Sequence, residues 1–208
     1  MRTIFRIVVV LQFIAMALCI GVAANVWMDA GAVIDDARQH GVLSPAPPRT
    51  PLSPFEHTVA VDQFAQTWGQ RAFPCRTLEL LWRDMSDADW TPPTTPASQR
   101  LATAILANRR GASIRWQVRR ILVACQLEQD YDDAQLMRAW LTLASFGPQT
   151  HGVEDAAQAI FGKSADALNA EEAARLVALL HTPSLRTQPE RWAERAREIQ
   201  QRVAAEPR

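Results

Sequence analysis

The chain has 208 residues, of which 22 are basic and 22 are acidic, so its formal net charge at pH 7 is zero. A neutral chain has no overall field that would attract nucleic acid, and we therefore expect no nucleic-acid partner. Its length suits one folded domain with an appendage, and because no metal-spaced ligand set or cofactor motif is present, we predict neither a metal nor a cofactor.

The chain begins with an apolar run from Ile7 to Trp27 that only two polar residues interrupt. About 20 helical residues span the hydrocarbon core of a bilayer, so this run is long enough to cross one. Two arginines precede it, which predicts a cytoplasmic N-terminus and an extracytoplasmic remainder. We predict a single-pass anchor over residues 1–28. A cleaved signal peptide is the alternative, because small residues occupy 21–24.

A proline-rich stretch follows, and we assign residues 29–54 to a linker. The folded domain is expected over residues 55–205. Apolar residues three and four apart predict a helix over Ser113–Gln129. Asp132 and Asn169 each begin a capping-box pattern, with Gln or Glu three residues later. Since no strand pattern alternates over any length, the sequence predicts a mainly α fold.

Two of the three cysteines, Cys75 and Cys125, lie in the predicted domain. They are able to pair if the domain is exported, although the sequence does not establish the geometry that a disulfide requires. The alternative for Cys125 is inert packing on an apolar helix face.

A stretch of 40 residues, Ser145–Ser184, carries a family resemblance. It reads SFGPQTHGVEDAAQAIFGKSADALNAEEAARLVALLHTPS and resembles the transglycosylase domain of penicillin-binding proteins and monofunctional peptidoglycan glycosyltransferases, glycosyltransferase family 51. The matches to the family pattern, in register, are Phe146-Gly147, Gly152-Val153-Glu154, Ala156-Ala157, Phe161-Gly162-Lys163, Leu168, Glu172-Ala173 and Pro183-Ser184.

The resemblance implies a lysozyme-like helical transglycosylase domain that elongates glycan strands from lipid II at the membrane surface. It also implies a bacterial inner (cytoplasmic) membrane, with the domain in the periplasm. In such a family one glutamate is the general base for the attacking hydroxyl, and a second acid supports the departure of the pyrophosphate.

The first family motif, Glu-Asp-x-x-Phe-x-x-His-x-Gly, is matched here by VAVDQFAQTWGQ. This alignment puts Ala60 and Val61 at the two acids and Thr67 at the histidine. A shift of one or two residues brings Asp62 near the carboxylate position, with a side chain one methylene shorter than that of glutamate. Asp62 is therefore the one candidate for a catalytic base at this motif, and Glu56 beside His57 is a second acid to consider.

The other two motifs depart from the family pattern as well. In the second, Gln99 persists but Arg100 replaces a glutamine and prolines replace the flexible glycines. In the third, Arg138 stands where the family carries its second acid. Both family acids are absent, so we expect no catalytic residue of the family type.

Six residues are candidates for ligand binding. Gln99, Gly147, Phe161 and Lys163 match the family pattern, and Lys163 is a possible anion contact. Arg115 and Arg119 belong to an arginine cluster and lie four apart on one helix face, where they are able to contact lipid headgroups or a pyrophosphate. A solvated face balanced by nearby acids is the simpler interpretation of that cluster.

The leading hypothesis is a membrane-anchored transglycosylase-like pseudoenzyme, either a non-enzymatic accessory in cell-wall synthesis or a module that binds glycan strands or lipid II. The first alternative is a divergent but active peptidoglycan glycosyltransferase that uses Asp62 or Glu56. The second is a structural partner of another envelope membrane protein, such as one of the cell-wall synthesis proteins.

Overall fold

The computed structural model describes residues 21, 24–43, 51–70, 75–87, 94–107, 113–148 and 150–206. A helix over residues 24–39 comes first. The elements that follow are α2 (Pro54–Val59), the π-helix η1 (Ala60–Phe64), α3 (Arg76–Ser86), α4 (Ala97–Ile105), α5 (Ile114–Asp130), α6 (Asp133–Leu143), β1 (Ser145–Gly147), β2 (Thr150–His151), α7 (Val153–Phe161), the 3-10 turn η3 (Ala165–Ala167), α8 (Ala170–His181), the 3-10 turn η4 (Pro183–Thr187) and α9 (Pro189–Ala205).

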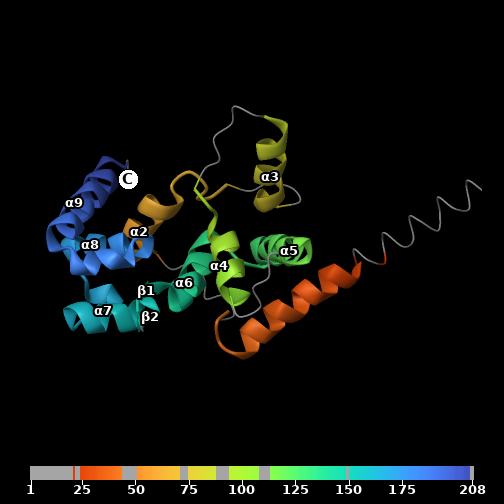
Figure 1. Cartoon of the computed structure of the whole chain (residues 1–208), viewed down its shortest axis with the longest axis horizontal. Helices are drawn as coiled ribbons and strands as arrows, with labels where there is room; N and C mark the ends of the chain where they lie inside the picture. Colours follow the sequence, from red (N-terminus) through yellow and green to blue (C-terminus); the bar gives the residue numbers. More distant parts are fainter. Residues whose placement is uncertain are drawn as a thin grey trace, which may run out of the picture.

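The mainly α fold predicted from the sequence is confirmed. Apart from two short strands, the regular secondary structure of the described residues is helical, and Figure 1 shows the helices arranged along one long axis, with α7, α8 and α9 toward one end. The predicted membrane anchor over residues 1–28 lies almost wholly outside the described residues. Within the part of the chain that is described, no helix is both long and apolar enough to cross a bilayer.

Capping patterns in the sequence mark where two of the helices begin. The Asp132 side chain accepts from the backbone N–H of Gln135 at the start of α6, and the Asn169 side chain accepts from the backbone N–H of Glu172 at the start of α8. Both arrangements are complete capping boxes, which satisfy backbone donors that would otherwise lack a partner. The predicted helix over Ser113–Gln129 is α5, with Ser113 as its N-cap.

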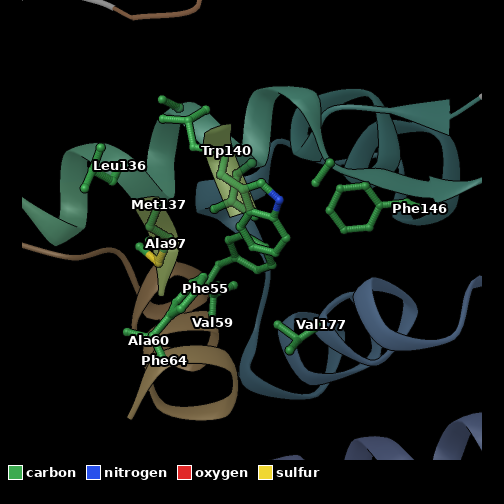
Figure 2. Close-up of a cluster of buried hydrophobic side chains, with 14 of the residues drawn as sticks. Phe55, Val59, Ala60, Phe64, Ala97, Leu136, Met137, Trp140, Phe146 and Val177 are labelled. Carbon is green, nitrogen blue, oxygen red and sulfur yellow. The ribbon is translucent and has the colours of Figure 1, made fainter. Parts of the chain in front are cut away.

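One hydrophobic core joins almost every element. Phe55, Val59 and Phe64 from α2 and η1 point toward Met137 and Trp140 of α6, as Figure 2 shows. The rings of Phe64 and Trp140 meet edge to face, with 5.6 Å between their centroids. Such an arrangement of aromatic rings is favourable beyond the area that it buries.

The residues assigned to the linker begin as a packed helix. Ala30, Val33, Ile34 and Ala37 of the helix 24–39 are buried in the common core. A disulfide between Cys75, the N-cap of α3, and Cys125 of α5 joins these two helices, and the Cα atoms of the two cysteines lie 5.2 Å apart.

A short antiparallel pair of strands, β1 and β2, was not expected from the sequence. Ser145 lies opposite His151 in its register. Gly152 follows with a φ of 85° and a ψ of 145°, a conformation that is essentially restricted to glycine. The backbone N–H of Gly152 donates to the carbonyl of Ala144 at 2.9 Å, which closes the hairpin at the start of α7.

Candidate functional site

The π-helix η1 turns a carboxylate into the interior of the protein. It continues directly from α2, and four of its five residues, Asp62 among them, are buried. A π-helix has a wider turn than an α-helix and is found frequently at functional sites. This turn brings both a polar pair, Asp62 and Gln63, and the apolar Phe64 to the inside.

Asp62 is enclosed by three polar side chains. Its Oδ2 accepts from Gln63 Nε2 at 2.6 Å and lies 3.0 Å from His181 Nε2. Its Oδ1 forms an ion pair with Arg202 Nη2 at 2.5 Å. The Asp62 side chain has 0% of its area exposed, whereas those of His181 and Arg202 are 37% and 46% exposed. The carboxylate is therefore covered, and its partners separate it from solvent.

These surroundings set the charge of Asp62. Burial acts to raise the pKa of its carboxyl, but the hydrogen bond with His181 and the charge of Arg202 outweigh burial, and the pKa lies below its ordinary value. A general base works best when its pKa is near the operating pH. Asp62, the one candidate base from the first motif, is thus charged and occupied as an ion-pair partner.

Arg100, which stands at a glutamine of the family pattern, completes the same cluster. Its Nη1 donates to Gln63 Oε1 at 2.7 Å. Its guanidinium carbon lies 5.2 Å from the centroid of the Phe64 ring and 5.1 Å from that of Trp140. Burial lowers the pKa of Arg100, and the charge of Asp62 partly offsets this effect. A cation held on two aromatic faces is stabilised by their quadrupoles.

Arg138, which we aligned with the second acid of the family pattern, pairs with a carboxylate on α2. Its Nε donates to Glu56 Oε1 at 2.6 Å and its Nη2 to Glu56 Oε2 at 2.9 Å, a bidentate pair. Glu56 also accepts from the backbone N–H of Ser53 at the start of α2. Burial acts to raise the pKa of Glu56, but Arg138 and Ser53 lower it further than burial raises it. Glu56, the second acid considered, is therefore engaged between α2 and α6.

Thr67, which stands at the family histidine, is also turned inward. It is 1% exposed, and its hydroxyl donates to the carbonyl of Phe64 at 3.2 Å. His57, which we considered with Glu56 as an acid and base pair, is exposed on α2 beside a groove of about 950 Å³ between α2, α8 and α9.

The six predicted ligand-binding residues do not form one group. Lys163, after the end of α7, contacts both carboxylate oxygens of Glu172 at 2.7 and 2.9 Å. Arg119 on α5 pairs with Asp29 at 2.6 Å, and Arg115 is exposed. Figure 1 places α5 and α7 on either side of α4 and α6.

The other three of the six have scaffold contacts. Gln99 on α4 accepts from Arg120 of α5 at 3.4 Å. Phe161 is half-buried against the core at the end of α7. Gly147 ends β1 with a φ of 139°, which favours glycine.

Sequence reasoning missed the partners of Asp62 and a second buried carboxylate, Glu128. His181 and Arg202 come to Asp62 from 119 and 140 positions along the chain, and no local spacing indicates either contact. Glu128 accepts from Ser98 Oγ at 2.5 Å and Thr77 Oγ1 at 3.1 Å, and is buried. Among the described residues, no group of three or more His, Cys, Asp and Glu side chains is arranged to hold a metal.

Comparison with known proteins identifies the scaffold. The model of the family described as "Transglycosylase" matches residues 94–206, so the segment that contains Asp62 lies before the matched range. Penicillin-binding protein 1C of Escherichia coli (strain K12) is 36% identical over 87 residues, which are 42% of this chain and 11% of that protein. Biosynthetic peptidoglycan transglycosylase of Acinetobacter baumannii (strain SDF) is 26% identical over 130 residues, 62% of this chain and 57% of that protein.

A third relative is also a penicillin-binding protein. Penicillin-binding protein 1A of Aquifex aeolicus (strain VF5) is 30% identical over 112 residues, which are 52% of this chain and 15% of that protein. The chain thus spans at most 57% of the length of these three relatives.

Proposed function

We propose a function for this chain from one premise: it belongs to the transglycosylase family. Membership supports a role related to peptidoglycan glycosyl transfer. Within that role, the chain acts as a non-enzymatic accessory in cell-wall synthesis that binds lipid II or glycan strands. An anchor over residues 1–28 holds it in a bacterial inner membrane, and its domain faces the periplasm.

The observation that carries this proposal is that the acids near the catalytic positions are used within the protein. Asp62 is covered by His181, Gln63 and Arg202, and Glu56 pairs with Arg138. In a working site of this family, one carboxylate must be free to accept a proton from a sugar hydroxyl. A second carboxylate must lie near the leaving group, where it supports the departure of the pyrophosphate. Neither carboxylate here is available for such a step without losing its partners.

A polymerisation assay tests the absence of activity. The full chain, purified in detergent, is incubated with lipid II beside the biosynthetic peptidoglycan transglycosylase of A. baumannii as the active reference, and glycan products are separated on a gel. We expect polymer from the reference and none from this chain. Polymer made by this chain, and lost in Asp62→Asn, would establish the divergent active enzyme instead.

A binding assay tests the second half of the proposal. Lipid II and short glycan strands are titrated separately against the full chain, and binding is followed by the shift in thermal unfolding. A saturable shift with either ligand supports a binding module and tells the two ligands apart. No shift with either, together with co-purification of cell-wall synthesis proteins, would leave the structural partner as the function.

A further inference from the structure

The helix α3 is buried only where it begins. Its N-cap Cys75 is 2% exposed, and the next two residues, Arg76 and Thr77, are 4% and 2% exposed. Residues 81–86, by contrast, are all exposed. Within the described residues the contacts of α3 are chiefly with α5, and Figure 1 shows α3 apart from α7, α8 and α9. The position of α3 therefore depends on its first turn, residues 75–78.

A disulfide ties this first turn to α5. It joins Cys75 to Cys125, which lies 50 positions further along the chain. Both cysteines are 2% exposed, so a reductant reaches the bond when the first turn of α3 lifts from α5. The Sγ atom of Cys75 also accepts from the backbone N–H of Leu78 at 3.4 Å. Because the N-terminus of a helix favours negative charge, Cys75 is the sulfur that leaves more readily as a thiolate.

Glu128 of α5 connects the first turn of α3 to the start of α4. Its buried carboxylate accepts from the backbone N–H of Arg76 at 2.7 Å and from Thr77 Oγ1 at 3.1 Å. The same carboxylate accepts from Ser98 Oγ on α4 at 2.5 Å. Two positions after Ser98, Arg100 belongs to the buried polar cluster of the candidate site. One route thus runs from the disulfide to that cluster through α4.

Arg76 connects the same turn to the segment that follows η1. Its Nη2 contacts Asp133 Oδ1 of α6 at 2.8 Å, and its Nη1 donates to the carbonyl oxygens of Thr67 and, at 3.2 Å, Gln70. The hydroxyl of Thr67 in turn donates to the carbonyl of Phe64, the last residue of η1. A second route therefore reaches the candidate site from the side of η1.

We propose that the disulfide between Cys75 and Cys125 is a site of thiol–disulfide exchange with a dithiol reductant, and that its redox state controls the order of the candidate site. One thiolate of the reductant attacks Cys125 Sγ, the S–S bond breaks, and Cys75 leaves as a thiolate. The second thiol attacks the mixed disulfide and releases Cys125. The reductant becomes a disulfide, and its two protons end on the two cysteines.

The consequence of reduction follows from the two routes. Once the first turn of α3 separates from α5, Glu128 loses the two donors that α3 supplies, and the segment after η1 loses the guanidinium of Arg76. Both α4 and η1 should then loosen, whereas α8, which holds no residue of either route, should not. This inference goes beyond the proposed function and does not depend on it, because neither lipid II nor a glycan strand takes part.

Hydrogen exchange across the redox change tests the coupling. The full chain in detergent is incubated with oxidised or reduced dithiothreitol, and backbone exchange is followed by mass spectrometry. On reduction we expect severalfold faster exchange in α3, in residues 100–105 of α4 and in residues 63–68, with no change in α8. Reoxidation should restore the slow rates. Acceleration confined to α3, equal acceleration in α8, or no acceleration at all would each overturn the proposal.

Ser98→Ala separates the two routes. It removes the hydroxyl that binds Glu128 but leaves the contacts of Arg76 in place. In this variant reduction should still accelerate exchange in α3 and in residues 63–68, while exchange in α4 should no longer respond. Ser86→Ala is the matched control, because the Ser86 hydroxyl donates to the carbonyl of Arg83 within α3, and it should respond like the wild type. A response of α4 that persists in Ser98→Ala would contradict the route through Glu128.

Glutathione, a monothiol, identifies the sulfur that is attacked. The full chain is incubated with reduced glutathione, free thiols are alkylated, and the peptides that contain each cysteine are analysed by mass spectrometry. We expect glutathione on Cys125 in severalfold excess over Cys75, with the alkyl group on Cys75. Glutathione mainly on Cys75 would overturn the assignment of the leaving sulfur. Failure of the chain to bind lipid II or glycan strands would reject the proposed function and leave these results unchanged.

Discussion

At the scale of single residues, Asp62 owes its character to its partners. An isolated carboxylate in a protein interior would favour its neutral form, because burial penalises charge. Here Arg202, His181 and Gln63 surround both carboxylate oxygens, and the pKa lies below its ordinary value. The same contacts that keep Asp62 charged also cover it from solvent. Its role follows from that enclosure: it links η1 to α8 and α9.

Asp62→Asn should destabilise the protein, because it leaves Arg202 and His181 beside a neutral amide. Buried hydrogen bonds to charged groups contribute about 1.5–3 kcal/mol each, so we expect a loss of about 2 kcal/mol in the free energy of unfolding. Urea denaturation followed by circular dichroism measures it. Glu198→Gln is the control, because Glu198 pairs with Arg195 on the surface and such pairs contribute up to about 1 kcal/mol. Equal losses in the two variants would contradict a structural role for Asp62.

The lowered pKa of Asp62 also predicts a dependence of stability on pH. In the unfolded chain this carboxyl has its ordinary pKa of 3.8 and binds a proton more readily than in the fold. Its contribution is therefore fully present above about pH 5 and is lost as the pH falls through the lower pKa of the folded state. The acid limb of a plot of unfolding free energy against pH should be shallower in Asp62→Asn than in the wild type. An unchanged limb would show that other carboxyls account for all of it.

At the scale of elements, the pair between Glu56 and Arg138 joins α2 to α6. The two side chains are 15% and 27% exposed and form two hydrogen bonds. The arginine at the position of the second family acid is thus accompanied by a carboxylate on a different helix. This pairing balances the charge of Arg138 between the two helices.

A charge change at Arg138 tests this coupling. Arg138→Glu restores the acid of the family pattern but opposes it to Glu56, and we expect a loss of about 2 kcal/mol in stability from the broken pair and the repulsion. Glu56→Gln/Arg138→Glu removes the repulsion and should recover part of that loss. Chemical denaturation of the two single variants and the double variant gives the coupling energy. If the effects of the single variants simply add, the two side chains are not coupled.

Glycines with a positive φ stand at both ends of α7: Gly152 before it and Gly162 after it. A Cβ on Gly152 would lie 3.0 Å from the carbonyl oxygen of Thr142, whereas one on Gly162 would meet nothing within 4 Å. Gly162 has a φ of 67°, in the left-handed helical region. We expect Gly162→Ala to cost about 1 kcal/mol and Gly152→Ala to cost more, up to about 3 kcal/mol. Thermal unfolding of the two variants orders them, and the reverse order would contradict this account.

Local signals in the sequence predicted most of the helices but not every element. Asp132 and Asn169 predict the starts of α6 and α8, because the hydrogen bonds of a capping box join residues that are only three positions apart. The π-helix η1 has no such local signal. Its N-terminus has no side-chain cap, and four of its five residues pack in the interior, so its wide turn depends on tertiary packing. The strands β1 and β2 together hold five residues, too few to produce an alternating pattern.

At the scale of the whole molecule, the family likeness is stronger in one part than in the other. The matched range, 94–206, includes the helices around α8, whose pattern of small and apolar residues was recognisable in the sequence. Asp62 was identified as a candidate base from the sequence. Its partners His181 and Arg202 lie on α8 and α9, and only the complete fold brings these two helices next to η1. A buried network of this kind is therefore not predictable from spacing, although each helix that contributes to it is.

The disulfide between Cys75 and Cys125 joins the start of α3 to α5, and its removal should loosen α3 first. Cys75 and Cys125 are separated by 50 residues, so the bridge restricts a long loop of the unfolded chain. We expect Cys75→Ser/Cys125→Ser to lose about 2–4 kcal/mol in the free energy of unfolding. Hydrogen exchange in α3 should rise, because within the described residues its contacts are chiefly with α5. Reductant should lower the stability of the wild type to that of the variant and leave the variant unchanged. A wild type that is indifferent to reductant would show that the two cysteines are not bonded in solution.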